Sequence, residues 1–154
     1  MKLSDIVVAD ALRASLQSTT RDEAIVELVT ALADAGAVDA AQIDSMVKAV
    51  IQREKQATTG FGKGIALPHA KLKGIKKPIF TIGGSAEGID FNSLDSKPVF
   101  SVILLLSSPD HPDEHLQAME TIFRHAQREQ FRSFLRQAKT NEAIYDLIVE
   151  VDSE

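Results

Sequence analysis

With 154 residues, 44% of them hydrophobic, the chain has the size of one globular domain with its own core. The formal net charge of -5 argues against general binding to nucleic acid or to membrane surfaces, and the absence of cysteine excludes disulfides, thiolate metal sites and a cysteine nucleophile. No apolar run reaches the length of a membrane span and the N-terminus lacks a secretory pattern, so we expect a single cytoplasmic domain over residues 1–154.

The N-terminal part of the chain is expected to contain a short helix, a strand and then a long helix. The short helix is expected at Leu3–Val8, and Leu12–Leu16 alternates apolar and polar residues as a half-buried strand does. Thr20 and Glu23 form a capping-box signature for a helix whose apolar residues recur at helical spacing until Gly36 ends it.

A second long helix leads into a glycine-rich stretch. Asp39 can cap this helix, which is expected to end near residues 53–55. Ile65–Leu67 indicates a brief buried strand. Between them lies a tight loop with three glycines, which allow positive φ and close approach of the backbone: Gly60, Gly62 and Gly64.

The middle of the chain predicts two strands separated by irregular backbone. A basic loop at Lys71–Lys77 precedes a strand at Pro78–Ile82, which is expected to end at Gly83–Gly84. After an irregular connection at Asp90–Lys97, the apolar run Val99–Leu106 is typical of a central strand covered on both faces.

The C-terminal part predicts helices after a polar loop at Pro109–Asp113. Apolar residues of the first helix recur at helical spacing: Leu116, Met119, Ile122, Phe123 and Ala126. Two shorter helical patterns follow, around Phe131–Ala138 and Ile144–Ile148. The order of elements predicts an α/β fold in which a small mixed β-sheet is flanked by helices on both faces.

The glycine-rich loop does not match a nucleotide-binding motif. Gly60–Gly64 lacks the Gly-Lys-Ser/Thr ending of a phosphate-binding loop, and its third glycine comes one place too early for the dinucleotide fingerprint. We interpret the loop instead as backbone that lets another molecule approach a neighbouring side chain.

That side chain is expected to be His69. Pro68 restricts φ and holds the chain extended, which presents the imidazole at a strand end beside glycines and free backbone N–H groups. This combination suits a nucleophilic nitrogen that receives an anionic group. The alternative for a single histidine is a hydrogen-bonded structural role.

A distinctive run surrounds His69: Arg53-Glu54-Lys55, then Thr58-Thr59-Gly60-x-Gly62-x-Gly64-Ile65-Ala66-Leu67-Pro68-His69. It resembles the phosphorylation-site signature of the fructose, mannitol and nitrogen-regulatory enzyme IIA domains of the bacterial phosphoenolpyruvate-dependent phosphotransferase system. The similarity continues through Glu87–Phe91, Leu94–Val99, Leu104–Leu106 and His115–Leu116, and therefore covers nearly the whole domain.

The resemblance implies that His69 accepts a phosphoryl group from the phosphohistidine of HPr or of its nitrogen-system counterpart. The second histidine of the family falls on His115, which would lie at a helix start with favourable potential for phosphate, and the active-site arginine falls on Arg53. A nucleophilic histidine also needs an acceptor that fixes its tautomer, and we expect a backbone carbonyl. No cofactor is implied.

Other residues leave alternatives open. Asp110–His115 offers metal ligands, but Pro112 places His111 outside the helix, so we expect no metal site there. His125 is expected to be structural or exposed. Phe61 and Gly62 are candidate partner contacts, although Phe61 can equally pack into the core.

Four arginines recur every four residues and would form one basic stripe on a continuous helix: Arg124, Arg128, Arg132 and Arg136. Such a stripe can bind an acidic partner. Neighbouring glutamates favour an ordinary solvated, salt-bridged face instead.

The leading functional hypothesis is a regulatory phosphocarrier, because Pro68–Leu72 resembles the nitrogen-regulatory branch and the chain ends soon after the domain. The alternatives are a free-standing fructose- or mannitol-type enzyme IIA that passes phosphate to enzyme IIB, and a binding module of the same fold without phosphotransfer. A metal-dependent hydrolase is a more distant alternative. The expected partners are HPr or its counterpart, and enzyme IIB or regulated transporters and kinases.

Overall fold

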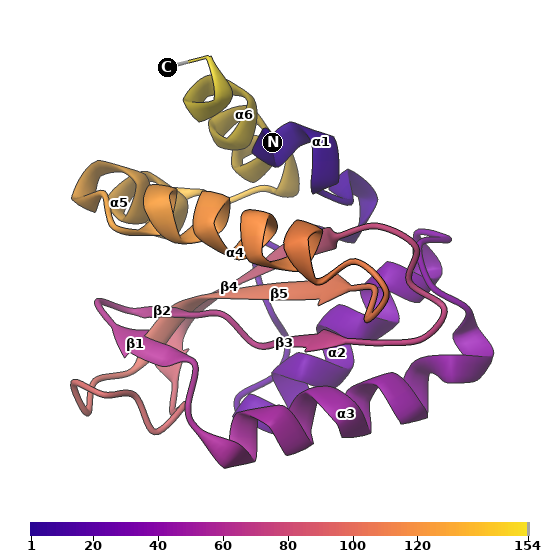
Figure 1. Ribbon diagram of the computed structural model, residues 1–154. Helices are drawn as coiled ribbons and strands as arrows, with labels where there is room; N and C mark the ends of the chain where they lie inside the picture. The colour runs from indigo at the N-terminus through magenta and orange to yellow at the C-terminus, as the bar shows by residue number, and fades with distance from the viewer. Residues whose placement is uncertain (154) are drawn as a thin grey trace.

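The continuous apolar run forms strand β5 (Val99–Ser107), which lies at the centre of the sheet in the computed structural model (Figure 1). Two short strands, β2 (Ile65–Ala66) and β3 (His69–Lys71), pair in parallel with successive parts of β5, and β4 (Ile79–Ile89) pairs with it antiparallel. β1 (Gly60–Gly62) forms an antiparallel hairpin with β2. The structure describes residues 1–153, and its sheet is the small mixed sheet that the sequence predicts.

Helices cover both faces of this sheet, as expected (Figure 1). One face packs against α2 (Arg21–Asp34) and α3 (Ile43–Gln56). The other packs against α4 (Pro112–Ala126), α5 (Glu129–Gln137), α6 (Asn141–Asp152) and α1 (Leu3–Ile6). Within residues 1–153, no helix is both long and apolar enough to span a membrane.

Alternate side chains of β5 belong to two separate hydrophobic cores. Leu104 and Leu106 lie in the core under α2 and α3, whereas Ile103 and Leu105 lie in the core under α4 to α6. This alternation follows from the pleat of the strand. All four are at most 1% exposed, and burial of each is worth about 1.5–3 kcal/mol.

Helix α2 begins as the sequence predicts, whereas Asp39 caps a short helix before α3 and not α3 itself. Thr20 caps α2, because its side chain accepts a hydrogen bond from the Glu23 amide at 3.3 Å. Asp39 accepts from the Ala41 amide and caps a short 3-10 helix, η2 (Ala40–Gln42), which leads directly into α3. A second 3-10 helix, η1 (Ala9–Ala11), follows α1.

Two predictions about strands are wrong, and they share one cause. Leu12–Leu16 forms no strand beyond an isolated bridge between Arg13 and Gly83, and β4 does not end at Gly83–Gly84 but continues to Ile89. The N-terminal segment runs close along β4, with the Arg13 amide donating to the Ile82 carbonyl at 3.0 Å. A Cβ at Gly83 would lie 2.7 Å from Leu16, and one at Gly84 would lie 2.7 Å from the Ala14 carbonyl oxygen. The two glycines therefore admit this close approach instead of ending the strand.

The predicted apolar face of α4 is also partly wrong. Leu116 and Phe123 are 58% and 37% exposed. The buried face contains polar side chains instead, since His115 and His125 are 9% and 6% exposed. The helix is therefore rotated about its axis relative to the prediction, which turns His115 toward β3 and His125 toward α5.

Candidate functional site

His69 is held at the start of β3, directly after the buried residues Leu67 and Pro68. It pairs in parallel with Leu105 of β5, which belongs to the core under α4. Because paired residues of neighbouring strands project from the same face, His69 projects toward α4. Its Nδ1 lies 2.8 Å from the Leu67 carbonyl oxygen.

This hydrogen bond determines the chemistry of the imidazole. A carbonyl oxygen can only accept, so Nδ1 of His69 carries the proton and donates it to Leu67. In the neutral ring the lone pair then lies on Nε2. The expected backbone acceptor is thus present, and it leaves Nε2 as the nucleophilic atom.

His115 lies beside His69, on the first turn of α4. The two ring centroids are 5.6 Å apart and the ring planes are inclined by 42°. Nδ1 of His115 is buried and has no hydrogen-bond partner among residues 1–153. The structure therefore brings together the two histidines that the sequence places 46 positions apart (115 − 69).

Both imidazoles are biased toward the neutral form. Burial lowers the pKa of His69, and the charge of Arg53 lowers it further, against an opposing effect of the hydrogen bond to Leu67. Burial, followed by the neighbouring His69 and Lys71, lowers the pKa of His115 to about 4. A neutral His69 keeps the Nε2 lone pair available at neutral pH.

Arg53 comes from the last turn of α3 and reaches the same region. Its Nη1 donates to the carbonyl of Ala57 at 3.1 Å, and its charge is close enough to lower the pKa of His69. The structure thus places the ring of His115 on α4 beside that of His69 on β3, and Arg53 on α3 near enough for its charge to act on His69.

Glu54 has a role that the sequence analysis missed. This carboxylate is 2% exposed and accepts hydrogen bonds from both the amide and the hydroxyl of Thr59, at 2.7 and 2.6 Å. It thereby fastens the end of α3, beside Arg53, to the residue before β1. The available signal was its position, because a carboxylate in the last turn of a helix opposes the helix dipole unless other donors compensate.

Lys71 is a second missed residue. It lies two positions after His69 on β3, on the same face of the strand, and its charge lowers the pKa of both histidines. An exposed cation thus lies beside the pair of imidazoles, where an anionic group would be attracted.

Phe61 packs against α4 and does not project freely. Its ring lies 4.5 Å from that of Phe123, centroid to centroid, and it is partly buried. Gly62 has φ of 110° and is buried, and a Cβ there would lie 3.2 Å from Asp95 Oδ2. A contact between a partner protein and this pair stays a prediction.

The remaining histidines lie elsewhere. His111 is the exposed residue just before α4, and His125 is buried with its ring 5.9 Å from that of Phe131. Among residues 1–153, no three or more histidine and carboxylate side chains are arranged to hold a metal ion.

A family model and several similar proteins indicate the same protein family. The model of the phosphoenolpyruvate-dependent sugar phosphotransferase system, EIIA 2, matches residues 6–151. The chain is 36% identical over 132 residues to the fructose-specific EIIA component of Haloferax volcanii, covering 86% of this chain and 84% of that protein. It is 38% identical over 104 residues to a nitrogen regulatory protein of Pseudomonas aeruginosa, covering 68% of each.

A longer relative contains the same domain. The fructose-specific EIIABC component of Bacillus subtilis is 32% identical over 152 residues, and the chain spans only 24% of its length.

Solved structures share the fold. Nitrogen regulatory protein IIA-Ntr of Neisseria meningitidis superposes with a TM-score of 0.84 at 20% identity, covering 95% of this chain and 98% of that one. The Escherichia coli mannitol enzyme IIA, solved in complex with phosphorylated enzyme IIB, superposes with a TM-score of 0.75 at 21% identity, covering 92% and 96%. The chain therefore belongs to the EIIA type 2 family of the phosphoenolpyruvate-dependent sugar phosphotransferase system, a family of phosphotransferase domains.

Proposed function

We propose that the protein is a phosphocarrier in which Nε2 of His69 accepts a phosphoryl group from the phosphohistidine of HPr or of its nitrogen-system counterpart. The observation that supports this proposal most directly is the 2.8 Å hydrogen bond between His69 Nδ1 and the Leu67 carbonyl. It leaves Nε2 unprotonated and orients the ring at the same time.

The proposed step conserves atoms and charge without a further reactant. The Nε2 lone pair attacks phosphorus as the nitrogen–phosphorus bond of the donor breaks, and the electron pair of that bond returns to the donor imidazole. Charge on the three phosphoryl oxygens must be stabilised during transfer. Arg53 supplies a fork of N–H donors for these oxygens, and Lys71 adds positive charge on the same face.

His115 is proposed to stabilise the phosphoryl group and not to receive it. A neutral imidazole can donate one hydrogen bond to a phosphoryl oxygen, and the first turn of the 15-residue helix α4 adds a favourable dipole. His115→Ala should therefore still accept phosphate but hold it poorly. Complete loss of labelling would mean that the two histidines have the opposite roles.

The test is phosphorylation by purified carriers. Incubation with phosphoenolpyruvate, enzyme I and HPr should add one phosphoryl group to the mass of the wild-type protein and none to His69→Ala. His111→Ala is the matched control, because this exposed histidine lies outside the proposed site and its loss should leave labelling unchanged. A folded wild-type protein that takes no label from either HPr or its counterpart would rule the proposal out.

For the output, we propose regulation of partner proteins through the phosphorylation state, within the cytoplasm. The nitrogen regulatory relatives support this output. The fructose-specific EIIA relative supports the second candidate, transfer to an enzyme IIB. Rapid transfer of the label from His69 to a fructose- or mannitol-type enzyme IIB would favour the second candidate, and partner capture that depends on phosphorylation without such transfer would favour regulation.

A further inference from the structure

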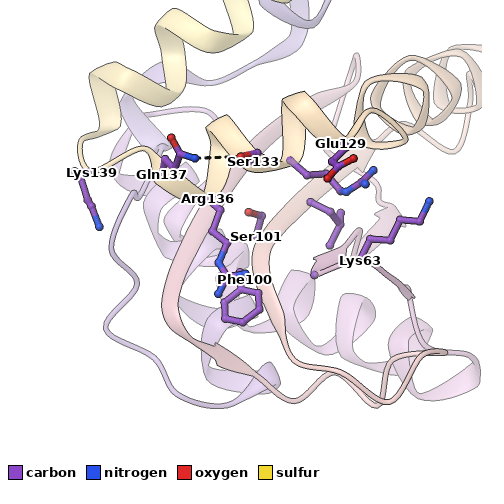
Figure 2. Close-up of a pocket in the computed structure, with 11 residues that line it drawn as sticks. Lys63, Phe100, Ser101, Glu129, Ser133, Arg136, Gln137 and Lys139 are labelled. Carbon is purple, nitrogen blue, oxygen red and sulfur yellow. Dashed lines mark hydrogen bonds between the residues drawn. The ribbon is translucent and has the colours of Figure 1, made fainter.

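A pocket of about 630 Å³ lies between the β1–β2 turn, the start of β5 and one face of α5 (Figure 2). The α5 residues that line it recur at helical spacing, from Glu129 to Gln137, opposite the buried side chains Phe131 and Leu135. Arg53, His69 and His115 are not part of its lining. The pocket is therefore separate from the proposed phosphoryl-transfer site.

The lining is strongly basic, although the chain as a whole carries a net charge of -5. Glu129 is the acidic residue in the lining. The cations are Lys63, Arg132, Arg136 and Lys139. Among residues 1–153, these four cations form no ion pair, so the lining keeps a net positive charge despite Glu129.

Both arginines are held in place by uncharged partners. Nη1 of Arg132 donates to the carbonyls of Ala126 and Gln127 at 2.9 and 2.8 Å, which satisfies backbone groups at the end of α4. The guanidinium carbon of Arg136 lies 3.5 Å from the ring centroid of Phe100, a cation–π contact that is visible in Figure 2. Both guanidinium groups are thus ordered without losing their positive charge, which reduces the entropy lost on binding an anion.

Hydroxyl groups and size narrow the class of ligand. Ser101 lines the pocket from β5 and is only 2% exposed, and Ser133 lines it from α5, where its hydroxyl accepts a hydrogen bond from Gln137 Nε2 at 3.1 Å (Figure 2). The volume is typical of pockets for small organic molecules. Guanidinium forks and ammonium groups together are the usual donors to phosphate oxygens.

We propose that this pocket binds a small organic molecule that carries two or more phosphate groups. The cations lie on the hairpin turn, on α5 and just beyond α5, so phosphates at two positions of one ligand can each be contacted. Lys63 and Gly64 lie in the β1–β2 hairpin, and the chain continues from this hairpin to His69. A ligand in the pocket therefore contacts the segment that positions the proposed nucleophile.

The experiment is an NMR titration of the full-length, isotope-labelled protein with fructose 1,6-bisphosphate as the probe, and with uncharged fructose as the control ligand. The expected result is saturable shift changes at Lys63–Ile65, Ser101 and Ser133, and none with fructose. Arg136→Gln should weaken binding about tenfold, since it removes a charge-assisted contact worth about 1.5 kcal/mol. Lys139→Gln should weaken it as well, and Lys76→Gln, on an exposed loop away from the pocket, should not.

Each other outcome overturns the proposal. Shift changes confined to His69 and His115 that disappear in Arg53→Gln would place the anion at the phosphoryl-transfer site. Equal weakening by Lys76→Gln and Lys139→Gln would show non-specific attraction. A lack of saturable binding by the folded wild-type protein at millimolar probe would also contradict it. Arg136→Gln is checked for folding by its own spectrum, and Lys63→Gln replaces it if the spectrum collapses.

Discussion

Helices α2 and α4 cover opposite faces of the same sheet, yet they bury different kinds of side chain. The six buried residues of α2 are all apolar. The buried face of α4 contains His115, Thr121 and His125 between its apolar residues, while Leu116 remains 58% exposed. Helix α2 therefore contributes stability through apolar packing. Helix α4 buries fewer apolar side chains, because part of its buried face consists of polar groups.

The largest predicted effect is on the apolar side of this comparison. Leu28 of α2 is completely buried, so Leu28→Ala should lower the free energy of unfolding by about 2–5 kcal/mol through lost burial and the resulting cavity. Urea unfolding measures the change. Val26→Ala, at a position 43% exposed on the same helix, is the control and should change stability by less than about 0.5 kcal/mol. Equal effects of the two substitutions would contradict the assigned packing of α2.

The next effect concerns the connection between α3 and the hairpin. Glu54→Gln should lower stability by about 1–3 kcal/mol, because the amide supplies one acceptor where the carboxylate accepts two hydrogen bonds from Thr59. It should also lower the pKa of His69 in an NMR titration, since the negative charge of Glu54 raises that pKa. Gln52→Glu, an exposed change two residues earlier in α3, serves as the control for a one-unit change of charge that leaves the contact to Thr59 intact. An unchanged His69 titration in Glu54→Gln would show that Glu54 does not act on the site.

The sequence predicts the apolar side of this comparison better than the α4 side. Helical spacing of apolar residues identifies α2 and most of α3, and a continuous apolar run identifies β5. The end of α3 departs from this pattern, because Glu54 is buried there. The buried face of α4 is not predictable in this way, since a rule that counts apolar residues selects Leu116 and Phe123 over His115. Gly83 and Gly84 were predicted to end a strand for a similar reason. They instead make room for Ala14 and Leu16, in a segment about seventy residues earlier in the chain, which local sequence does not reveal.

The site shows the same division between motif and tertiary contact. The motif suggested His69, His115 and Arg53. The structure places the two imidazoles side by side and Arg53 near enough to act on His69, while their roles stay a proposal. A backbone carbonyl was expected to accept from His69, but that it belongs to Leu67 was not predicted, and neither was the role of the Glu54 carboxylate. Both depend on where a strand turns and where a helix ends. Backbone geometry of that kind is determined by tertiary packing and not by residue type.

A smaller effect is expected at Arg53. Arg53→Lys should slow phosphoryl transfer about tenfold, because lysine retains the charge but loses the forked contact to two phosphoryl oxygens. Quench-flow labelling by phosphorylated HPr measures the rate. Lys55→Arg, an exposed change in the same turn of α3, should leave the rate unaltered. Stability should change little in either variant, and an unchanged rate in Arg53→Lys would count against its proposed contact to phosphate.

The smallest effect is a dependence of stability on pH that belongs to the α4 side alone. The pKa of His115 is about 4 in the folded protein and close to 6.5 in the unfolded chain. Between these values the unfolded chain binds more protons, so the free energy of unfolding should fall as the pH drops from 6.5 toward 4 and become independent of this residue below that range. Between pH 7.5 and pH 5.5, the titration of His115 should lower the free energy of unfolding by about 1 kcal/mol.

Urea unfolding of the wild type, His115→Ala and Leu28→Ala at pH 7.5 and 5.5 separates the two helices. His115→Ala should lose less stability between the two pH values than the wild type, because the titrating group has been removed. Leu28→Ala should lose the same amount as the wild type from a lower starting point, since no proton binds at that position. If His115→Ala retained the full pH dependence, His115 would titrate normally in the folded state, and the polar face of α4 would not hold it neutral beside His69.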